Sequence, residues 1–223
     1  MTTATHVRHH TSVLAATEKR ALVWIAERLP RSINSDHLSA LGLASMAGAG
    51  LAFWYGQSNP VAGMALVVVA LGLNWFGDSL DGTVARVRDQ QRPRYGFYVD
   101  HVIDLTGTAF FFAGVAASGF MSPLVAVLVV AAYFLVSAEA YLATHTRGVF
   151  KMAFMGVGPT ELRILLAVGA LRLIDGPFVN PFGLGEMRLF DIGGAIAAAG
   201  MVAVFVITAS ANVRALYVEE TRR

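Results

Sequence analysis

Three long stretches without a charged residue constrain this chain more than any other feature. Residues 38–77, 105–138 and 192–213 contain no Asp, Glu, Lys or Arg. A helix needs about 20 apolar residues to cross the roughly 30 Å hydrocarbon core of a bilayer, and only helices and closed barrels satisfy their backbone polar groups there. With 56% hydrophobic and 14% charged residues, the sequence predicts an all-α integral membrane protein.

Turn-forming residues divide these stretches into shorter spans. GQSNP at 56–60 separates a first span from a second, and ASGFMSP at 117–123 separates a third from a fourth. A fifth candidate reaches adequate length only if it starts near Pro159, which places Glu161 and Arg163 inside it. We therefore expect a bundle of six transmembrane helices with apolar centres at about 38–55, 61–77, 105–116, 124–138, 164–173 and 192–213.

Basic residues predict the orientation. Only Arg172 and Arg188 fall in connections that would face outward, and all other Lys and Arg residues lie on the opposite side. We expect the protein to lie in the inner cell membrane. By the positive-inside rule, both of its termini are expected in the cytosol. No cleaved leader is expected, because the first 20 residues lack an apolar core. The absence of cysteine excludes disulfides, thiolate zinc sites and catalytic thiols.

The predicted organisation has three parts. Residues 1–37 would be a cytosolic N-terminus with a juxtamembrane amphipathic helix, 38–217 the membrane domain, and 218–223 a cytosolic tail. Within 12–32, apolar residues recur at helical spacing, which favours a helix lying on the membrane surface. Glu18 interrupts this apolar face. A helix packed on the cytosolic loops is the alternative.

Four aspartates lie near the cytosolic ends of the second and third spans. Asp78 and Asp81 are three residues apart, and Asp100 and Asp104 are four apart, so each pair shares one helix face. Because the second span runs towards the cytosol and the third returns, both pairs lie at the same depth in antiparallel neighbours. Isolated charges at that depth are costly and are normally paired or functional. We expect the two faces to converge.

Shared divalent cations would resolve the repulsion between these acids. Oxygen ligands suit Mg²⁺, Mn²⁺ or Ca²⁺, four carboxylates are enough for two ions, and paired hard cations commonly handle phosphate. Gly82, Ala85 and Gly96 are small and would leave space against the helices. Arg86 offers a guanidinium fork for a phosphate or a base edge. The stretch therefore predicts a site for a nucleotide diphosphate.

The same residues carry a family signature. Their pattern is D-x-x-D-G-x-x-A-R from residue 78 and G-x-x-x-D-x-x-x-D from residue 96. It closely resembles the signature of the CDP-alcohol phosphotransferases, or CDP-alcohol phosphatidyltransferases, integral membrane enzymes of phospholipid synthesis. Weaker similarity at LPRSINSDHLSALGL (29–43) and GPTELR (158–163) extends the resemblance over residues 29 to about 217.

The resemblance implies roles for individual residues. A phosphatidyl group would pass from CDP-diacylglycerol to a small alcohol, with release of CMP. Asp78, Asp81 and Asp100 would ligate two Mg²⁺ or Mn²⁺ ions on the diphosphate, while Asp104 would contact a metal and act as general base. Family members are commonly homodimers, which implies the same here. The residues expected against the CDP moiety are Asp81, Gly82, Ala85, Arg86, Gly96 and Asn74.

The acceptor is predicted from basic residues. Arg163 would be a charged residue inside a fifth span of barely adequate length, so it needs a partner of opposite charge. Glu161, Asp104 or an anionic acceptor could be this partner. With Arg147, Lys151 and Arg214 it would form a basic pocket that favours glycerol phosphate or inositol phosphate. A positive-inside loop would give the same pattern, so neutral or zwitterionic acceptors such as serine remain open.

Other functions remain open at this point. CDP-choline or CDP-ethanolamine could donate to diacylglycerol instead. A divalent-cation transporter would also use acids, but transporters tend to place them near the midplane between repeats, and this sequence has no repeat. A scaffold with a degenerate site would be expected to lack an aspartate. No nucleic-acid partner is expected, and Arg88, Asp89, Arg92 and Arg94 are interpreted as ordinary loop charges.

Overall fold

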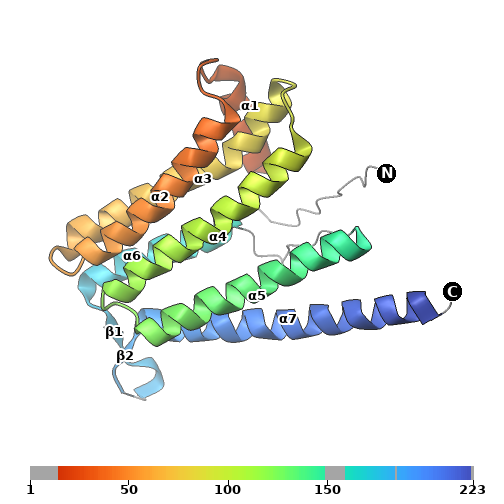
Figure 1. The fold of residues 1–223 in the computed structure, drawn as a ribbon. Helices are drawn as coiled ribbons and strands as arrows, with labels where there is room; N and C mark the ends of the chain where they lie inside the picture. The colour runs from red at the N-terminus through yellow and green to blue at the C-terminus, as the bar shows by residue number, and fades with distance from the viewer. Residues whose placement is uncertain (1–14, 149–158, 184, 222–223) are drawn as a thin grey trace.

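The structure, a computed structural model, describes residues 15–148, 159–183 and 185–221, except for the side chains of residues 15–17 and 182. Helices make up most of this part of the chain (Figure 1). Their bounds are α1 Ala15–Arg28, α2 Ser35–Tyr55, α3 Pro60–Val87, α4 Pro93–Ala117, α5 Pro123–Arg147, α6 Pro159–Arg172 and α7 Leu189–Thr221.

Proline and polar caps explain where the helices begin. Pro60, Pro93 and Pro123 open α3, α4 and α5, since a proline at the first helical position has a suitable φ and lacks only a donor that would be unpaired there. Asn34 caps α2 by accepting a hydrogen bond from the backbone of His37 at 3.0 Å. The predicted turns thus fall at helix boundaries.

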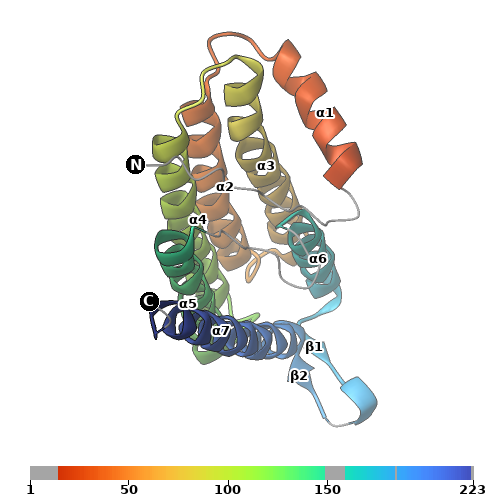
Figure 2. The same ribbon diagram turned by 90° about the vertical axis from the view of Figure 1, so that its right-hand side faces the viewer.

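Five of the described helices, α2, α3, α4, α5 and α7, are long and apolar enough to cross a membrane. The predicted fifth span corresponds to α6, which has 14 residues and would extend about 21 Å, less than a bilayer core. α6 lies along α3 (Figure 2), and its Ala170 belongs to the apolar core. The structure therefore confirms an all-helical chain with several candidate spans, while the count of six is not confirmed.

α2 lies between α3 and α4 and packs closely against both, whereas α3 and α4 have little direct contact. A Cβ added to Gly77 would lie 2.5 Å from the carbonyl oxygen of Leu38, and one added to Gly114 would lie 2.1 Å from that of Gly50. Small residues let helix backbones approach in this way in membrane proteins. The expectation that α3 and α4 are direct neighbours is therefore wrong, because α2 sets the distance between them.

An aromatic cluster forms the centre of the apolar core. Phe53 is fully buried and makes edge-to-face contacts with Phe111, Phe120 and Phe190 at centroid distances of 5.5 to 6.5 Å, the geometry that aromatic pairs prefer. These rings come from α2, α4, the turn after α4, and α7. The cluster thus joins the C-terminal halves of α2 and α4 to the start of α7.

The apolar face of α1 is covered by protein. Leu22 and Ala26 are buried against Leu38, Leu80 and Val84 of α2 and α3, and α1 lies beside α3 in Figure 2. This arrangement favours the packed alternative over a helix that offers this face to lipid, because the ends of α2 and α3 supply an apolar partner for it.

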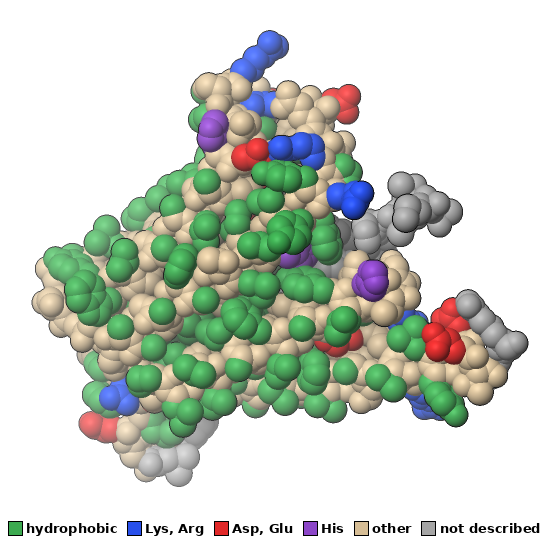
Figure 3. All heavy atoms as spheres, viewed as in Figure 1, with side chains coloured by type: hydrophobic (Ala, Val, Ile, Leu, Met, Phe, Trp, Pro, Cys, Tyr) green, Lys and Arg blue, Asp and Glu red, His purple; other side chains and the backbone are tan. Residues whose placement is uncertain are grey.

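α5 and α7 form a long pair on the other side of the molecule (Figure 1). Asp191 at the start of α7 accepts hydrogen bonds from the backbone and hydroxyl of Ser122 at the start of α5. The preceding connection contains a short antiparallel ribbon, Phe178–Val179 (β1) with Met187–Arg188 (β2). Hydrophobic side chains cover much of the face seen in Figure 3, and charges gather near its ends.

Candidate active site

The predicted acids occupy the C-terminal part of α3 and the N-terminal half of α4. Asp78 and Asp81 lie in α3, and Asp100 and Asp104 lie in α4. All four are partly buried. The side chains of Asp78 and Asp100 remain 26% and 27% exposed, so they stay accessible from the space between the helices.

Asp81 is held by two donors. Ser39 Oγ of α2 donates to Asp81 Oδ2 at 2.6 Å, and the backbone nitrogen of Gly82 donates to Oδ1 at 2.5 Å. Ser39 is buried, and its Oγ also lies 3.1 Å from the carbonyl oxygen of Ser35, so its single proton is directed mainly at the closer Asp81. Hydrogen bonds to a charged oxygen are stronger than neutral ones, so Ser39 fixes the orientation of this carboxylate.

Arg163 of α6 joins the acids directly. Its Nη2 donates to Asp78 Oδ2 at 2.5 Å, and its Nε donates to Asn74 Oδ1 at 2.7 Å. Asn74 is buried, and its Nδ2 donates to the carbonyl of Gly42 at 3.0 Å. Arg163 thus has a partner among the acids, as expected, but this partner is Asp78, which the sequence analysis did not name. Asn74 orients this arginine, while its predicted contact with a CDP moiety stays a prediction.

Asp104 faces the same region as the other acids. The charges of Asp78, Asp100, Asp81 and Arg163 all act on its carboxylate. Within residues 15–148, 159–183 and 185–221, however, no three acidic or histidine side chains stand close enough together to hold a metal ion. The structure thus brings the acids to one region without assembling them into a ligand set.

The donor chemistry of this region nevertheless fits a hard divalent cation. Its oxygens come from carboxylates on two helices that α2 holds apart, as Mg²⁺ and Mn²⁺ prefer. The guanidinium of Arg163 already stands at Asp78 as a cation among the acids. Metal ligation by the four aspartates therefore stays a prediction, and the chemistry of their carboxylates suits it.

Of the predicted small residues, Gly96 borders open space and Gly82 borders a flexible side chain. A Cβ at Gly96 would meet nothing within 4 Å, and one at Gly82 would meet the guanidinium of Arg86 at 3.2 Å. Arg86 lies back along its own helix and donates to Thr83 Oγ1 at 2.9 Å, and Ala85 follows one turn after Asp81 in the same helix. Helix packing among the described residues does not demand a glycine at Gly82 or Gly96, which agrees with a role in leaving room for a ligand.

The remaining predicted acceptor residues are placed less centrally. Arg147 ends α5 and donates to Asn212 Oδ1 of α7, which ties it to the α5 and α7 pair. Arg214 is exposed on α7. Lys151 lies outside the described residues. Of the basic residues proposed for an acceptor pocket, Arg163 is the one with a described contact to the acids.

Two loop arginines have structural roles that sequence reasoning missed. Arg88 donates to the carbonyls of Leu29, Pro30 and Ile33, and Arg92 pairs with Asp36 at 2.5 Å. The interpretation of both as ordinary loop charges is wrong, because Arg88 ties the connection after α3 to the connection between α1 and α2, and Arg92 ties it to the first turn of α2. No local pattern indicates this.

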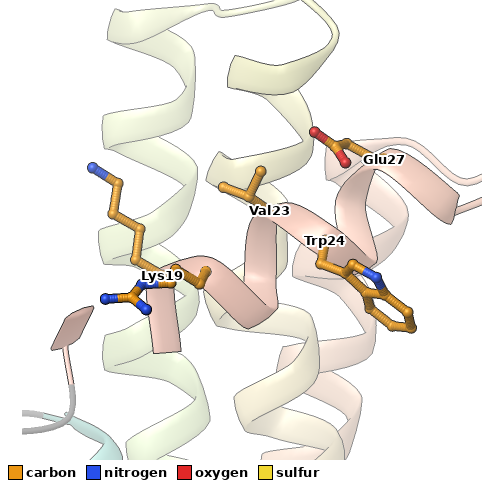
Figure 4. Close-up of a pocket in the computed structure, with 5 residues that line it drawn as sticks. Lys19, Val23, Trp24 and Glu27 are labelled. Atoms are coloured by element: carbon orange, nitrogen blue, oxygen red, sulfur yellow. The ribbon is translucent and has the colours of Figure 1, made fainter. Parts of the chain in front are cut away.

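A shallow hollow on α1 is lined by Lys19, Arg20, Val23, Trp24 and Glu27 (Figure 4). None of the aspartates lines it, and Trp24 is 58% exposed there. The hollow is a surface feature separate from the acidic region.

Comparisons with known proteins agree with the motif. The model of the family described as CDP-alcohol phosphatidyltransferase matches residues 36–209. Among solved structures, the chain is similar to the crystal structure of Mycobacterium tuberculosis phosphatidylinositol phosphate synthase (PgsA1) with CDP-DAG bound, with a TM-score of 0.55 and 20% identity over 89% of this chain and 92% of that one. This likeness shows the fold. A sequence search of curated proteins gave no significant match.

Proposed function

This chain belongs to the CDP-alcohol phosphatidyltransferase family, and we propose that it transfers a phosphatidyl group from CDP-diacylglycerol to a phosphorylated alcohol, with release of CMP. The best candidates for the acceptor are inositol phosphate and glycerol phosphate. The donor is suggested by the CDP-DAG bound to the structural relative. Membership of an enzyme family favours this function over a cation transporter.

The contact of Arg163 with Asp78 carries the proposal of a phosphorylated acceptor. A guanidinium fork matches the geometry of a phosphate, which it can bind with two hydrogen bonds. Arg163 is largely buried, with its side chain 16% exposed, and it stands beside the acids where the reaction would occur. An uncharged acceptor such as inositol would give this cation no comparable partner.

The reaction is a displacement at the phosphorus that carries diacylglycerol. The acceptor hydroxyl oxygen forms a bond to this phosphorus, and the bond from the phosphorus to the bridging oxygen of the diphosphate breaks, so that CMP leaves with that oxygen. Asp104 takes the proton of the hydroxyl. Arg86, beside Gly82, would hold the nucleotide part, and Arg163 would hold the acceptor phosphate.

Two Mg²⁺ or Mn²⁺ ions, when bound, would neutralise charge that develops on the diphosphate. Asp78, Asp81, Asp100 and Asp104 would hold them, with Ser39 orienting Asp81. Arg163, which contacts Asp78 here, would hold the acceptor phosphate beside these carboxylates.

The cellular arrangement follows from the same proposal. With α6 as the fifth span, the chain would cross the inner membrane six times, with both termini and the acids on the cytosolic side. Lipid tails would enter beside α3 and α4, and two copies would form the homodimer that the family resemblance implies.

The test is CMP release by purified protein in lipid nanodiscs with Mg²⁺ or Mn²⁺. CDP-diacylglycerol is offered with inositol 1-phosphate, glycerol 3-phosphate, serine or inositol, and CDP-choline with diacylglycerol serves as the reversed pair. We expect CMP with one phosphorylated alcohol and none after Asp100→Asn. Asp89→Asn is the matched control, because Asp89 has φ +53°, a conformation that Asn tolerates well. Release with serine alone would refute the role given to Arg163.

A further inference from the structure

Glu18 of α1 connects three helices. Its Oε1 accepts a hydrogen bond from Trp75 Nε1 of α3 at 2.7 Å and another from Thr160 Oγ1 of α6 at 2.8 Å. The neighbouring residues on this face, Leu22 and Ala26, pack against α3. The interruption of the apolar pattern by Glu18 therefore has a structural reason, since two donors on other helices meet it there.

Both partners of Glu18 lie next to residues of the acidic site. Trp75 follows Asn74 in α3, and Thr160 lies three residues before Arg163 in α6. The first turns of α6 are thus attached to α3 at two neighbouring points. Thr160 is linked to α3 through Glu18, and Arg163 bonds α3 directly. The first attachment sets the rotation of the helix that carries Arg163.

The start of α6 buries little apolar surface against the rest of the described chain. Leu162, Ile164 and Leu165 are 50%, 50% and 67% exposed, and Ala170, near the other end, is the residue that the described helix buries. Segments with few buried apolar contacts open locally at low cost. Hydrogen bonds at Thr160 therefore contribute much of what orients this turn.

We propose that Glu18 is a positioning residue for acceptor binding, acting through Thr160 and α6 on Arg163. The proposal rests on the proposed function, because it takes the acceptor phosphate to be the ligand of Arg163. Glu18 contacts no substrate itself. On this proposal α1 helps to hold the reaction site in place. Its loss would weaken binding of the acceptor alcohol more than binding of CDP-diacylglycerol.

The kinetic test compares three variants of the full chain in nanodiscs. Glu18→Ala removes the acceptor of both hydrogen bonds, whereas Glu18→Gln keeps a side-chain carbonyl oxygen in its place. Glu27→Ala is the matched control, since it makes the same change on the same helix at a side chain that is 56% exposed on the surface seen in Figure 4. The probes are inositol 1-phosphate and glycerol 3-phosphate, each varied at saturating CDP-diacylglycerol.

Glu18→Ala is expected to raise the KM for the acceptor about tenfold, the effect of one to two net hydrogen bonds, with kcat and the KM for CDP-diacylglycerol unchanged. Glu18→Gln and Glu27→Ala should keep the wild-type values. An equal loss for both substrates, or an equal loss in Glu18→Ala and Glu18→Gln, would overturn the proposal.

Hydrogen exchange gives a readout that needs no activity. The backbone amides of residues 163–166 donate to the carbonyls of the first turn of α6, so they report its opening in protein without substrate or metal. We expect about tenfold faster exchange in Glu18→Ala and none of this change in Glu18→Gln or Glu27→Ala. Unchanged exchange in Glu18→Ala would refute the attachment.

Thr160→Val covers the case in which Glu18→Ala does not fold, because it removes one donor and keeps the shape of the side chain. About threefold faster exchange at residues 163–166 is then expected, and wild-type exchange would overturn the proposal. If no alcohol yields CMP with the wild type, the proposed function fails, while exchange still decides whether Glu18 holds α6.

Discussion

Glycines of α3 and α4 serve opposite purposes in two regions of this molecule. Beside α2, a Cβ at Gly77 or Gly114 would collide with backbone atoms at 2.5 or 2.1 Å. Beside the acids, a Cβ at Gly96 would meet nothing within 4 Å. The same residue type thus allows helices to touch in one region and keeps a surface clear in the other.

This difference indicates which substitutions should lower the stability of the protein and which should lower its activity. In the packed region the backbone of α2 cannot move aside, since it contacts two helices at once. In the acidic region the neighbours are side chains, such as the guanidinium of Arg86, and they can move. Substitutions in the two regions should therefore separate stability from activity.

The largest expected effect lies in the acidic region. Asp81→Asn removes a charge that Ser39 and the Gly82 backbone orient, so CMP release should fall by at least about 10³-fold, as for the loss of a main electrostatic group. The melting temperature in detergent should stay close to that of the wild type. A variant that keeps a tenth of the activity would contradict a role in holding an ion.

Gly114→Ala should show the reverse behaviour. Its Cβ would fall 2.1 Å from the carbonyl oxygen of Gly50, and such overpacking costs about 1–3 kcal/mol or more. Heating followed by size-exclusion chromatography should show a clearly lower midpoint. Gly72→Ala is the control, because a Cβ there meets nothing within 4 Å; equal midpoints for both variants would break the comparison.

Gly96→Ala is expected to weaken binding of the donor substrate without lowering the stability of the protein. An exposed glycine within a helix costs up to about 1 kcal/mol relative to alanine, so stability should be kept or raised. The KM for CDP-diacylglycerol should rise about tenfold if the added methyl group displaces the nucleotide, a loss of about 1.4 kcal/mol. An unchanged KM would mean that this surface does not receive the donor.

Ser39→Ala should have the smallest effect of the four. It removes the 2.6 Å hydrogen bond to Asp81 without touching substrate, so kcat/KM should fall by roughly five- to tenfold, in line with about 1 kcal/mol for one hydrogen bond. A titration of activity with Mn²⁺ should show weaker apparent metal binding. Ser45→Ala is a control, since Ser45 donates within its own helix to Leu41.

Part of the fold could be predicted because its signals are local. Pro60, Pro93 and Pro123 stand at the starts of helices, and the uncharged stretches, once divided at their turns, lie in helices that could span a membrane. The placement of α2 between α3 and α4 could not be predicted, because it depends on which glycines face one another. The contacts of Arg88 and Arg92 were also missed, because the charge of an arginine does not indicate which distant residue it will contact.

By itself the sequence determined that this protein lies in a membrane and that four aspartates and their small neighbours line two helices, because hydropathy and the three- or four-residue spacing of side chains are properties of a single helix. Only the tertiary structure decided that Ser39 orients Asp81, that Arg163 meets Asp78, and that Glu18 reaches Thr160. These pairs are 42, 85 and 142 residues apart. Contacts over such separations arise from how helices pack, and helical periodicity carries no information about them.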